Sequence, residues 1–247
     1  MSTASKHPQS KTSQLRNTQI PTTDPLAGLR LTEIFYSLQG EALAAGLPTI
    51  FIRLTGCPLR CTYCDTTYSF TGGARWGLDE ILTHIASFPC KRVCITGGEP
   101  LAQPNVIALM KLLLEHGYDI SLETAGALSV KDVPPAVSKV MDLKTPSSGE
   151  NKRNLWENFG HLTNHDQIKI VIADRTDYEW AVEKLWQYEL HKKCAVVWFS
   201  PMFEIDERRS DVPNIAVQLA EWILADGLPV RLQLQLHKII WADARGK

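Results

Sequence analysis

The sequence contains no apolar run long enough to cross a membrane, and its first residues lack the hydrophobic core of a secretion signal. It also lacks an excess of basic charge, since 26 Lys and Arg stand against 27 Asp and Glu, and this disfavours direct binding to nucleic acid. Six cysteines are too few for a dense disulfide framework in 247 residues. We therefore expect a cytoplasmic protein with free thiols, in contact with neither a membrane nor nucleic acid.

Hydrophobic residues make up 44% of the chain, which is enough for the core of one large domain or two small ones. The segment 1–27 is an exception, because it is rich in Ser, Thr, Gln, Lys and Pro and poor in large apolar side chains. Such a segment buries too little surface to offset the entropy that is lost on ordering. We expect a flexible N-terminal tail at 1–27 and a catalytic domain at 28–247.

After the tail, short apolar runs alternate with segments of helical periodicity. We expect strands at 29–35, 49–56, 91–96, 119–124, 137–144, 167–172, 195–199 and 230–234, and helices at 78–88, 103–116, 176–190 and 215–225. This alternation is typical of βαβ units, and it predicts an α/β fold with a mostly parallel sheet, arranged as a partial, incompletely closed (β/α) barrel. The polar segment 147–164 is expected to be a loop that is free to move over the site.

Three cysteines stand close together in the spacing C-x3-C-x2-C: Cys57, Cys61 and Cys64. Loop thiolates at such a spacing can hold three corners of a [4Fe–4S] cluster and leave one iron open to a substrate or cofactor. Structural zinc is the alternative, but zinc sites usually have a second ligand pair. Cys90 and Cys94 have the right spacing for one, yet they stand in and before an apolar segment. We interpret Cys90, Cys94 and Cys194 as core or surface thiols.

Further polar residues fall at the expected carboxyl ends of strands, where barrel-like sheets carry their active sites. They include the cysteines, the turn Gly97-Gly98-Glu99-Pro100, Glu123 with Thr124, Lys144 and Ser200. Arg53 interrupts an apolar strand, and a buried arginine needs an anionic partner. That partner is either a structural carboxylate or a bound substrate, and the sequence leaves both open.

The cysteine spacing, Tyr63 before the third cysteine and the GGEP turn together resemble the radical S-adenosylmethionine (SAM) superfamily. The motifs at 37–41, 53, 64–66, 96–100 and 235–238 are similar to those of the 7-carboxy-7-deazaguanine synthases, radical SAM enzymes of queuosine and 7-deazapurine biosynthesis. This resemblance runs from about Leu29 to the C-terminus. It implies a lyase that converts 6-carboxy-5,6,7,8-tetrahydropterin into 7-carboxy-7-deazaguanine and ammonia by radical ring contraction.

The resemblance also implies cofactors, partners and residue roles. The cofactors are a [4Fe–4S] cluster, SAM, which is regenerated, and Mg²⁺; the partners are an electron donor such as flavodoxin or ferredoxin and a second copy in a homodimer. The implied roles are cluster binding by Cys57, Cys61 and Cys64; Mg²⁺ binding by Thr66; substrate binding by Leu38, Gln39, Gly40, Arg53 and Thr96; and SAM binding by Tyr63, Gly98, Glu123, Asp142, Lys144, Ser200, Pro201 and Met202.

Some alternatives stay open at this point. His237 and Lys238 either contact the substrate or simply close the sheet, and the chain continues past them to Lys247. A radical SAM activating enzyme that acts on a protein partner has the same cysteine spacing, although Arg53 and the turn at 39–41 favour a small anionic substrate. A protein with a purely structural metal is the third alternative.

Overall fold

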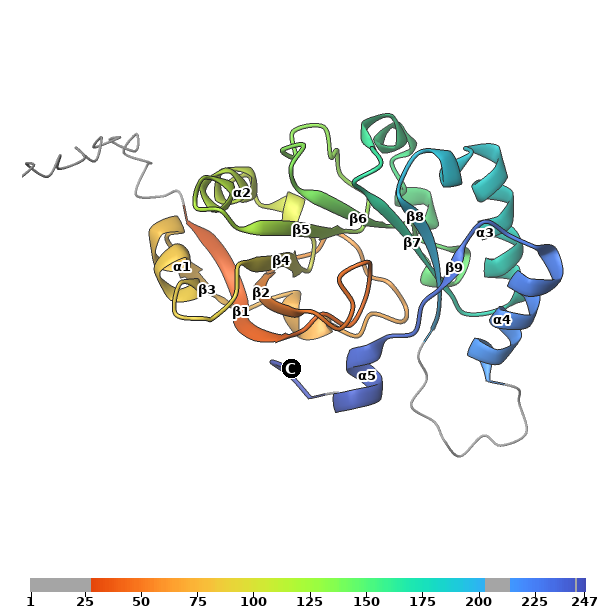
Figure 1. Ribbon diagram of the computed structural model, residues 1–247, viewed down its shortest axis with the longest axis horizontal. Coiled ribbons are helices and arrows are strands. Elements are labelled where there is room, and N and C mark those ends of the chain that lie inside the picture. The colour runs from red at the N-terminus through yellow and green to blue at the C-terminus, as the bar shows by residue number, and fades with distance from the viewer. Residues whose placement is uncertain (1–27, 203–213, 243) are drawn as a thin grey trace, which may run out of the picture.

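Nine strands form one sheet in the order β3-β1-β2-β4-β5-β6-β7-β8-β9 (Figure 1). The computed structural model describes residues 28–202, 214–242 and 244–247, so the tail expected at 1–27 lies outside the described residues. The strands are β1 Leu29–Leu38, β2 Pro48–Leu54, β3 Ala74–Trp76, β4 Arg92–Gly97, β5 Asp119–Thr124, β6 Ser138–Asp142, β7 Gln167–Ile172, β8 Val196–Pro201 and β9 Arg231–Leu232.

The sheet is parallel from β2 to β9, whereas β1 runs antiparallel to both of its neighbours, β2 and β3. No hydrogen bonds join the two outer strands, β3 and β9, within the described residues. The sheet is therefore open along one side. This confirms the expected α/β fold with a mostly parallel, incompletely closed barrel.

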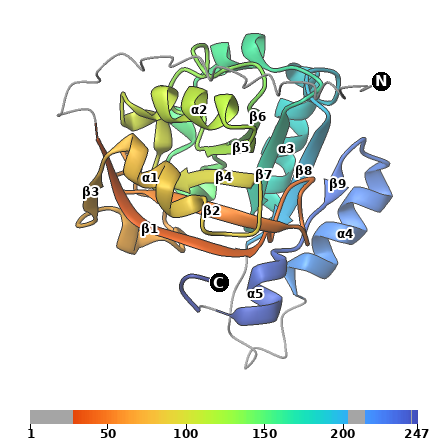
Figure 2. The same ribbon diagram turned by 60° about the vertical axis from the view of Figure 1, so that its left-hand side comes forward.

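Four α-helices, α1 to α4, cover the outer face of the sheet, whereas α5 lies at the cavity on its other side (Figures 1 and 2). The α-helices are α1 Leu78–Ile85, α2 Val106–Glu115, α3 Arg175–Gln187, α4 Ile215–Asp226 and α5 Leu236–Trp241. The 3-10 helices are η1 Thr67–Ser69, η2 Pro100–Ala102, η3 Pro146–Ser148, η4 Asn151–Arg153, η5 Trp156–His161 and η6 Leu190–Lys192. None of the helices in the described part of the chain is long and apolar enough to cross a bilayer.

Local signals explain where these helices start and stop. The side chain of Asp174 accepts a hydrogen bond from the Asp177 amide at the start of α3, as an N-cap residue does. Helix α4 ends at Asp226 and is capped by Gly227, whose φ of 58° lies in the left-handed region that glycine tolerates. Two apolar clusters fill the space beneath the helices, one under α1 and α2 and one under α3 and α4. Between them they anchor all the parallel strands from β2 to β8 and so fix the strand ends.

Four features differ from the expectation. Strand β3 was missed, because three residues are too few for a periodic signal. Only Arg231 and Leu232 of the expected strand at 230–234 pair with β8. His237 and Lys238 lie on α5 and do not close the sheet, so that interpretation is wrong. The expected loop at 147–164 contains most of three short 3-10 helices, and its Asn158 is fully buried.

Candidate active site

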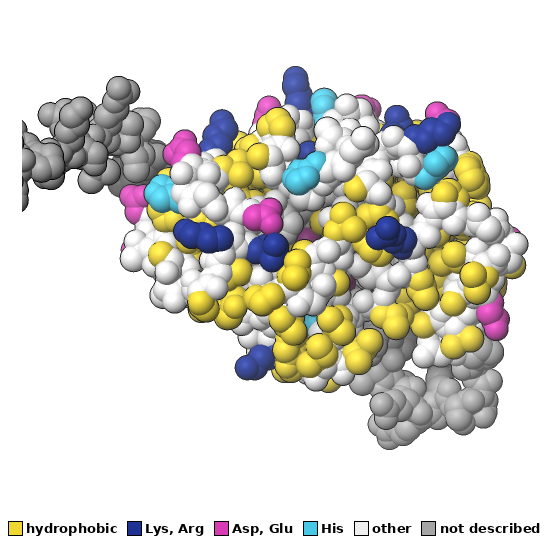
Figure 3. Space-filling view, viewed as in Figure 1, with side chains coloured by type: hydrophobic (Ala, Val, Ile, Leu, Met, Phe, Trp, Pro, Cys, Tyr) yellow, Lys and Arg dark blue, Asp and Glu magenta, His cyan; other side chains and the backbone are white. Residues whose placement is uncertain are grey.

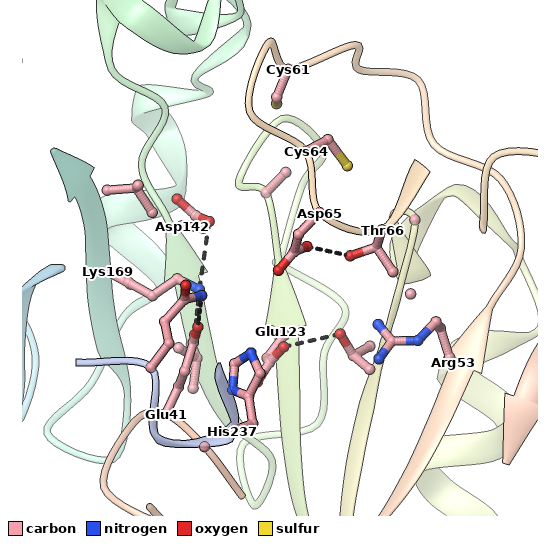
Figure 4. A pocket seen from close by; sticks show the side chains of 18 of the residues that line it. Glu41, Arg53, Cys61, Cys64, Asp65, Thr66, Glu123, Asp142, Lys169 and His237 are labelled. Carbon is pink, nitrogen blue, oxygen red and sulfur yellow. Dashed lines mark hydrogen bonds and ion pairs between the residues drawn. The ribbon is translucent and has the colours of Figure 1, made fainter. Parts of the chain in front are cut away.

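A cavity of about 280 Å³ opens at the carboxyl ends of the parallel strands (Figure 4). It is lined by most of the residues that the sequence predicted for the site: Leu38, Gln39, Gly40, Arg53, Cys57, Cys61, Tyr63, Cys64, Thr66, Thr96, Gly98, Glu123, Asp142, Lys144, Met202, His237 and Lys238. Ser200 and Pro201 are buried outside the lining, and the Ser200 hydroxyl donates to the Gln233 carbonyl at 3.0 Å. The structure thus brings the predicted residues together, apart from these two.

The GGEP turn packs against the backbone that leads into the cysteine loop. The Gly98 amide donates to the Leu54 carbonyl at 3.0 Å, and the Glu99 amide donates to the Gly56 carbonyl at 2.8 Å. A Cβ atom on Gly98 would lie 2.1 Å from the Gly56 oxygen, so no side chain fits there. Glycine at this position lets the turn after β4 approach the loop that follows β2.

Cys57, Cys61 and Cys64 are half-buried at one end of the cavity, and Figure 4 shows the latter two on the loop that arches over it. Burial is the main cause that raises the pKa of all three thiols. Thiols in this state lose their protons when iron binds. Three thiols that converge on one cavity beside a tightly approaching backbone turn are a suitable donor set for a cluster with one open iron.

Glu99 of the same turn is fully buried and faces away from solvent. Its carboxylate accepts hydrogen bonds from the Thr124 hydroxyl at 2.9 Å and from the Ala125 amide at 2.7 Å. Burial raises the pKa of this carboxyl, although the hydrogen bonds oppose the rise. Glu99 therefore ties the turn after β4 to the end of β5, and it holds two strand ends of the site in register.

Arg53 has a structural partner and also faces the cavity. Its Nε lies 2.7 Å from a carboxylate oxygen of Glu33, and its guanidinium lies 5.7 Å from the ring centre of Phe35. Figure 4 shows the Nη side of the guanidinium pointing into the cavity. Burial alone would lower the pKa of Arg53, but the nearby Tyr68 and Glu33 raise it, so the side chain stays charged. Of the two alternatives left open by the sequence, the structural carboxylate is present as Glu33, while Arg53 also lines the cavity.

Thr66 and Asp65 supply oxygen atoms beside Arg53. The Thr66 hydroxyl donates to Asp65 Oδ1 at 2.6 Å, and Lys238 Nζ lies 3.8 Å from Asp65 Oδ2. Hydroxyl and carboxylate oxygens are the ligands that Mg²⁺ prefers, usually with water completing the octahedron. The donor set fits this ion.

Glu123 forms hydrogen bonds with two residues that were predicted to bind the substrate. The Thr96 hydroxyl donates to Glu123 Oε2 at 2.9 Å, and the Gln39 side-chain amide donates to Oε1 at 3.4 Å. Asp142 instead accepts from the Lys144 ammonium at 2.9 Å, near Cys61. The predicted SAM residues therefore fall into two groups, with Glu123 on the substrate side and Asp142 and Lys144 on the cysteine side.

A buried charge network that the sequence analysis missed lines the same cavity. Lys169 Nζ lies 2.5 Å from Glu41 Oε2 and 3.7 Å from Asp142 Oδ2, and the Gln235 side-chain amide donates to Glu41 Oε1 at 2.5 Å. The backbone strengthens this link, since the Leu236 amide donates to the Gly40 carbonyl at 3.0 Å. Lys169 interrupts the apolar strand β7 as Arg53 interrupts β2, and that signal was available in the sequence.

Substitution of Glu41 by Gln should remove the main anionic partner of the buried Lys169 ammonium. We expect a loss of about 3 kcal/mol in the free energy of unfolding, at the low end of the range for a broken buried ion pair because Asp142 stays nearby. Urea unfolding of the wild type and the variant at pH 7 measures this difference. Glu115→Gln on the exposed face of α2 is the control, and it should change stability little.

The same difference should depend on pH. Burial alone would raise the pKa of Glu41, but Lys169 and the hydrogen bonds from Lys169 and Gln235 outweigh it and lower this pKa from 4.5 to about 2. A depressed carboxyl pKa stabilises the fold above the unfolded value and loses that effect as pH falls towards the folded value. The stability gap between wild type and Glu41→Gln should therefore shrink between pH 4.5 and 2, and a gap that stays constant would contradict the pairing.

Comparison with known proteins agrees with this geometry. Residues 51–142 match the family model described as the Radical SAM superfamily. The chain is 45% identical over 219 residues to the 7-carboxy-7-deazaguanine synthase of Koribacter versatilis, covering 86% of this chain and 97% of the relative, and 43% identical to that of Chlorobaculum tepidum, covering 89% and 98%.

A solved structure, that of QueE from Escherichia coli, superposes with a TM-score of 0.68 at 24% identity, covering 85% of this chain and 95% of the other, and it supports the fold. Radical SAM membership implies a [4Fe–4S] cluster and SAM, which decides against structural zinc. The chain belongs to the 7-carboxy-7-deazaguanine synthase family of radical SAM enzymes.

Proposed function

We propose that this enzyme converts 6-carboxy-5,6,7,8-tetrahydropterin into 7-carboxy-7-deazaguanine and ammonia, with SAM as a regenerated cofactor. The observation that carries the proposal is one cavity with three cysteines at one end and the Arg53 guanidinium projecting into it. The names of the relatives support the product. Anaerobic incubation with this pterin, dithionite, SAM and Mg²⁺ should yield the deazaguanine, and an enzyme with an intact cluster that gives none would refute the proposal.

In this proposal, the two ends of the cavity bind different groups, the cofactors at the cysteine end and the substrate at the Arg53 end. Cys57, Cys61 and Cys64 hold the cluster, and when it is bound, the cluster and SAM supply a 5′-deoxyadenosyl radical that takes a hydrogen atom from substrate C6. Tyr63, Gly98, Asp142, Lys144 and Met202 bind SAM at the cysteine end. Ser200 and Pro201 are buried at the end of β8, directly before Met202, and help to position it. Burial raises the pKa of Tyr63 to about 12, so its hydroxyl stays protonated and is able to donate.

At the other end, Arg53 binds the pterin carboxylate through its free guanidinium edge, where the planar fork suits two oxygens. Leu38, Gln39, Gly40 and Thr96 contact the ring system, and His237 on α5 lies beside Gly40, where a Cβ would come 2.1 Å from its Nδ1. Glu123 fixes the Gln39 and Thr96 side chains by accepting from both. These groups orient the substrate carbon that must meet the radical.

Thr66→Ala should remove the response of the rate to Mg²⁺, because the variant loses the hydroxyl proposed to ligate the ion. The measurement is product formation against Mg²⁺ concentration under anaerobic conditions. Thr67→Ala, next to it on the exposed side of η1, is the matched control and should keep the response. Unchanged Mg²⁺ stimulation in Thr66→Ala would remove this ligand assignment.

The alternative of an activating enzyme with a protein partner is less well supported. The cavity of about 280 Å³ is rimmed by α5 and the turn after β1, which suits a small molecule. Formation of 5′-deoxyadenosine that depends on the pterin, and on no added protein, separates the two functions.

We further propose that the enzyme is a homodimer. Apolar side chains gather where α5 and the β1–β2 turn reach the surface (Figure 3), among them Leu43, Leu47, Ile239 and Ile240, each at least 42% exposed. Contiguous exposed apolar surface is typical of an interface. Light scattering at micromolar concentration should give twice the mass of 27.7 kDa, and a monomer would contradict the proposal.

A further inference from the structure

A second cavity, of about 270 Å³, adjoins the active-site cavity at the end where Arg53 lies. The side chains common to the lining of both include Arg53, Asp65, Thr66, His237 and Lys238, so the two spaces meet there. The lining of the second cavity continues over residues that do not line the first, namely Thr67, Tyr68, Ala242, Ala244, Arg245 and Gly246. We call this second space the outer cavity.

The outer cavity is cationic. Arg53 and Lys238, where it meets the active site, have only 16% and 12% of their side chains exposed. Arg245 and Lys247 add two exposed cations to its lining. Asp65 is the one acidic side chain among the described residues that line it, and its Oδ2 lies 3.8 Å from Lys238 Nζ. This excess of positive charge around a hollow attracts an anion.

Arg245 is held in place by an aromatic ring. After α5 the chain turns back towards β1 (Figures 1 and 2), and the Arg245 guanidinium stacks 4.1 Å from the ring centre of Tyr68. The Tyr68 hydroxyl donates to Glu33 Oε1 at 3.0 Å, and the same oxygen lies 2.7 Å from Arg53 Nε. Tyr68 therefore links the guanidinium at the rim of the outer cavity to the one at its junction with the active site.

The Arg245 charge is available to a ligand. It forms no ion pair with a carboxylate anywhere in residues 28–202, 214–242 and 244–247. A guanidinium that is already stacked loses less entropy on binding, and its planar fork suits the two oxygens of a carboxylate. Arg245 and Arg53 thus offer the same recognition chemistry at two depths.

We propose that the outer cavity is an entry site, which captures a fused bicyclic heterocycle bearing a carboxylate and passes it to Arg53. The proposal rests on the proposed function, which identifies this ligand as the carboxylated pterin. The carboxylate pairs first with the exposed Arg245 and then with the more buried Arg53, and no covalent bond changes on the way. Charge of the opposite sign around the entrance raises the rate of association of an anionic ligand.

The test measures ligand capture apart from catalysis. The probe is 6-carboxypterin, which is fluorescent and has no hydrogen atom at C6 to lose, and stopped-flow fluorescence follows its binding to the anaerobic holoenzyme. Arg245→Glu should slow the association by about tenfold and make it nearly independent of salt, because the charge that salt screens has been reversed. Binding of the uncharged 6-methylpterin should change by less than about twofold, since steering acts on charge.

Two further variants separate a local site from other effects. Arg245→Lys keeps the charge and should restore most of the association rate. Arg75→Glu is the matched control, because Arg75 is also exposed but lines neither cavity, and it should leave the rate nearly unchanged.

An unchanged association rate in Arg245→Glu would overturn the entry site. Equal slowing by Arg75→Glu would overturn it too, since only the net charge of the protein would then matter. Equal slowing of 6-methylpterin would do the same, because it would show damage to the shape of the site. A wild type that captures 6-carboxypterin as described but makes no deazaguanine from the tetrahydropterin would instead refute the proposed function, so the two failures are distinguishable.

Discussion

Replacement of any one of Cys57, Cys61 or Cys64 by alanine should abolish SAM cleavage. Each thiol occupies a different point of one loop around the same cavity, so a neighbouring cysteine has no route to replace the lost ligand. A cluster with two protein thiolates is not held at the position where its open iron meets SAM. Anaerobic reconstitution followed by iron analysis, with 5′-deoxyadenosine measured under dithionite, checks this result.

The matched controls are the other three cysteines. Cys94 and Cys194 are buried and Cys90 is half-buried, and all three lie outside the cavity lining. Cys94→Ala should keep about four irons per chain and cost only about 1–3 kcal/mol of stability, as expected for a small core cavity. A folded Cys94→Ala protein without a cluster would show that the ligands are misassigned.

Much of this site was predictable because parallel strands deliver their carboxyl ends to one edge. The sequence places the cysteines, the GGEP turn and Lys144 at such ends, and their convergence follows from the alternation of strands and helices. The strands at 119–124 and 167–172 match the structure at both ends. Their apolar residues are buried and fix the register, so periodicity was sufficient there.

Other features depend on contacts between distant segments, which no local pattern records. Glu41 and Lys169 are 128 positions apart, and only the folded sheet shows that they pair. Helix α5 covers only six residues, too few for a clear helical period, and a hydrogen bond from its Leu236 amide to the distant Gly40 carbonyl fixes its position. Ser200 was predicted to bind SAM and stands at a strand end, but its hydroxyl donates a hydrogen bond to the Gln233 carbonyl instead of lining the cavity. The position of a residue along a strand predicts how near it lies to the carboxyl edge of the sheet. Which face of the sheet its side chain occupies depends on the exact register of the strand.

Arg53→Ala should weaken binding of the carboxylated pterin strongly and leave the cluster and SAM binding intact. Removing one partner of a desolvated, hydrogen-bonded charge pair typically costs about 2–5 kcal/mol, equivalent to roughly 30-fold to 5,000-fold in Kd. Only 16% of the Arg53 side chain is exposed, so water screens the pair little. Substrate titration of the anaerobic holoenzyme measures the loss, and SAM binding is measured in parallel as an internal control.

Arg53 also pairs with Glu33, so the substitution alone does not separate a binding role from a structural one. A tetrahydropterin with a 6-methyl group in place of the 6-carboxylate separates them. If Arg53 binds the carboxylate, wild type should prefer the carboxylated ligand strongly, and Arg53→Ala should bind both ligands about equally. If the variant instead loses affinity for both by the same factor, Arg53 acts through the Glu33 pair on the shape of the cavity. If it binds the carboxylated pterin as wild type does, the carboxylate site lies elsewhere, and Lys238 on α5, which also lines the cavity, becomes the first residue to test.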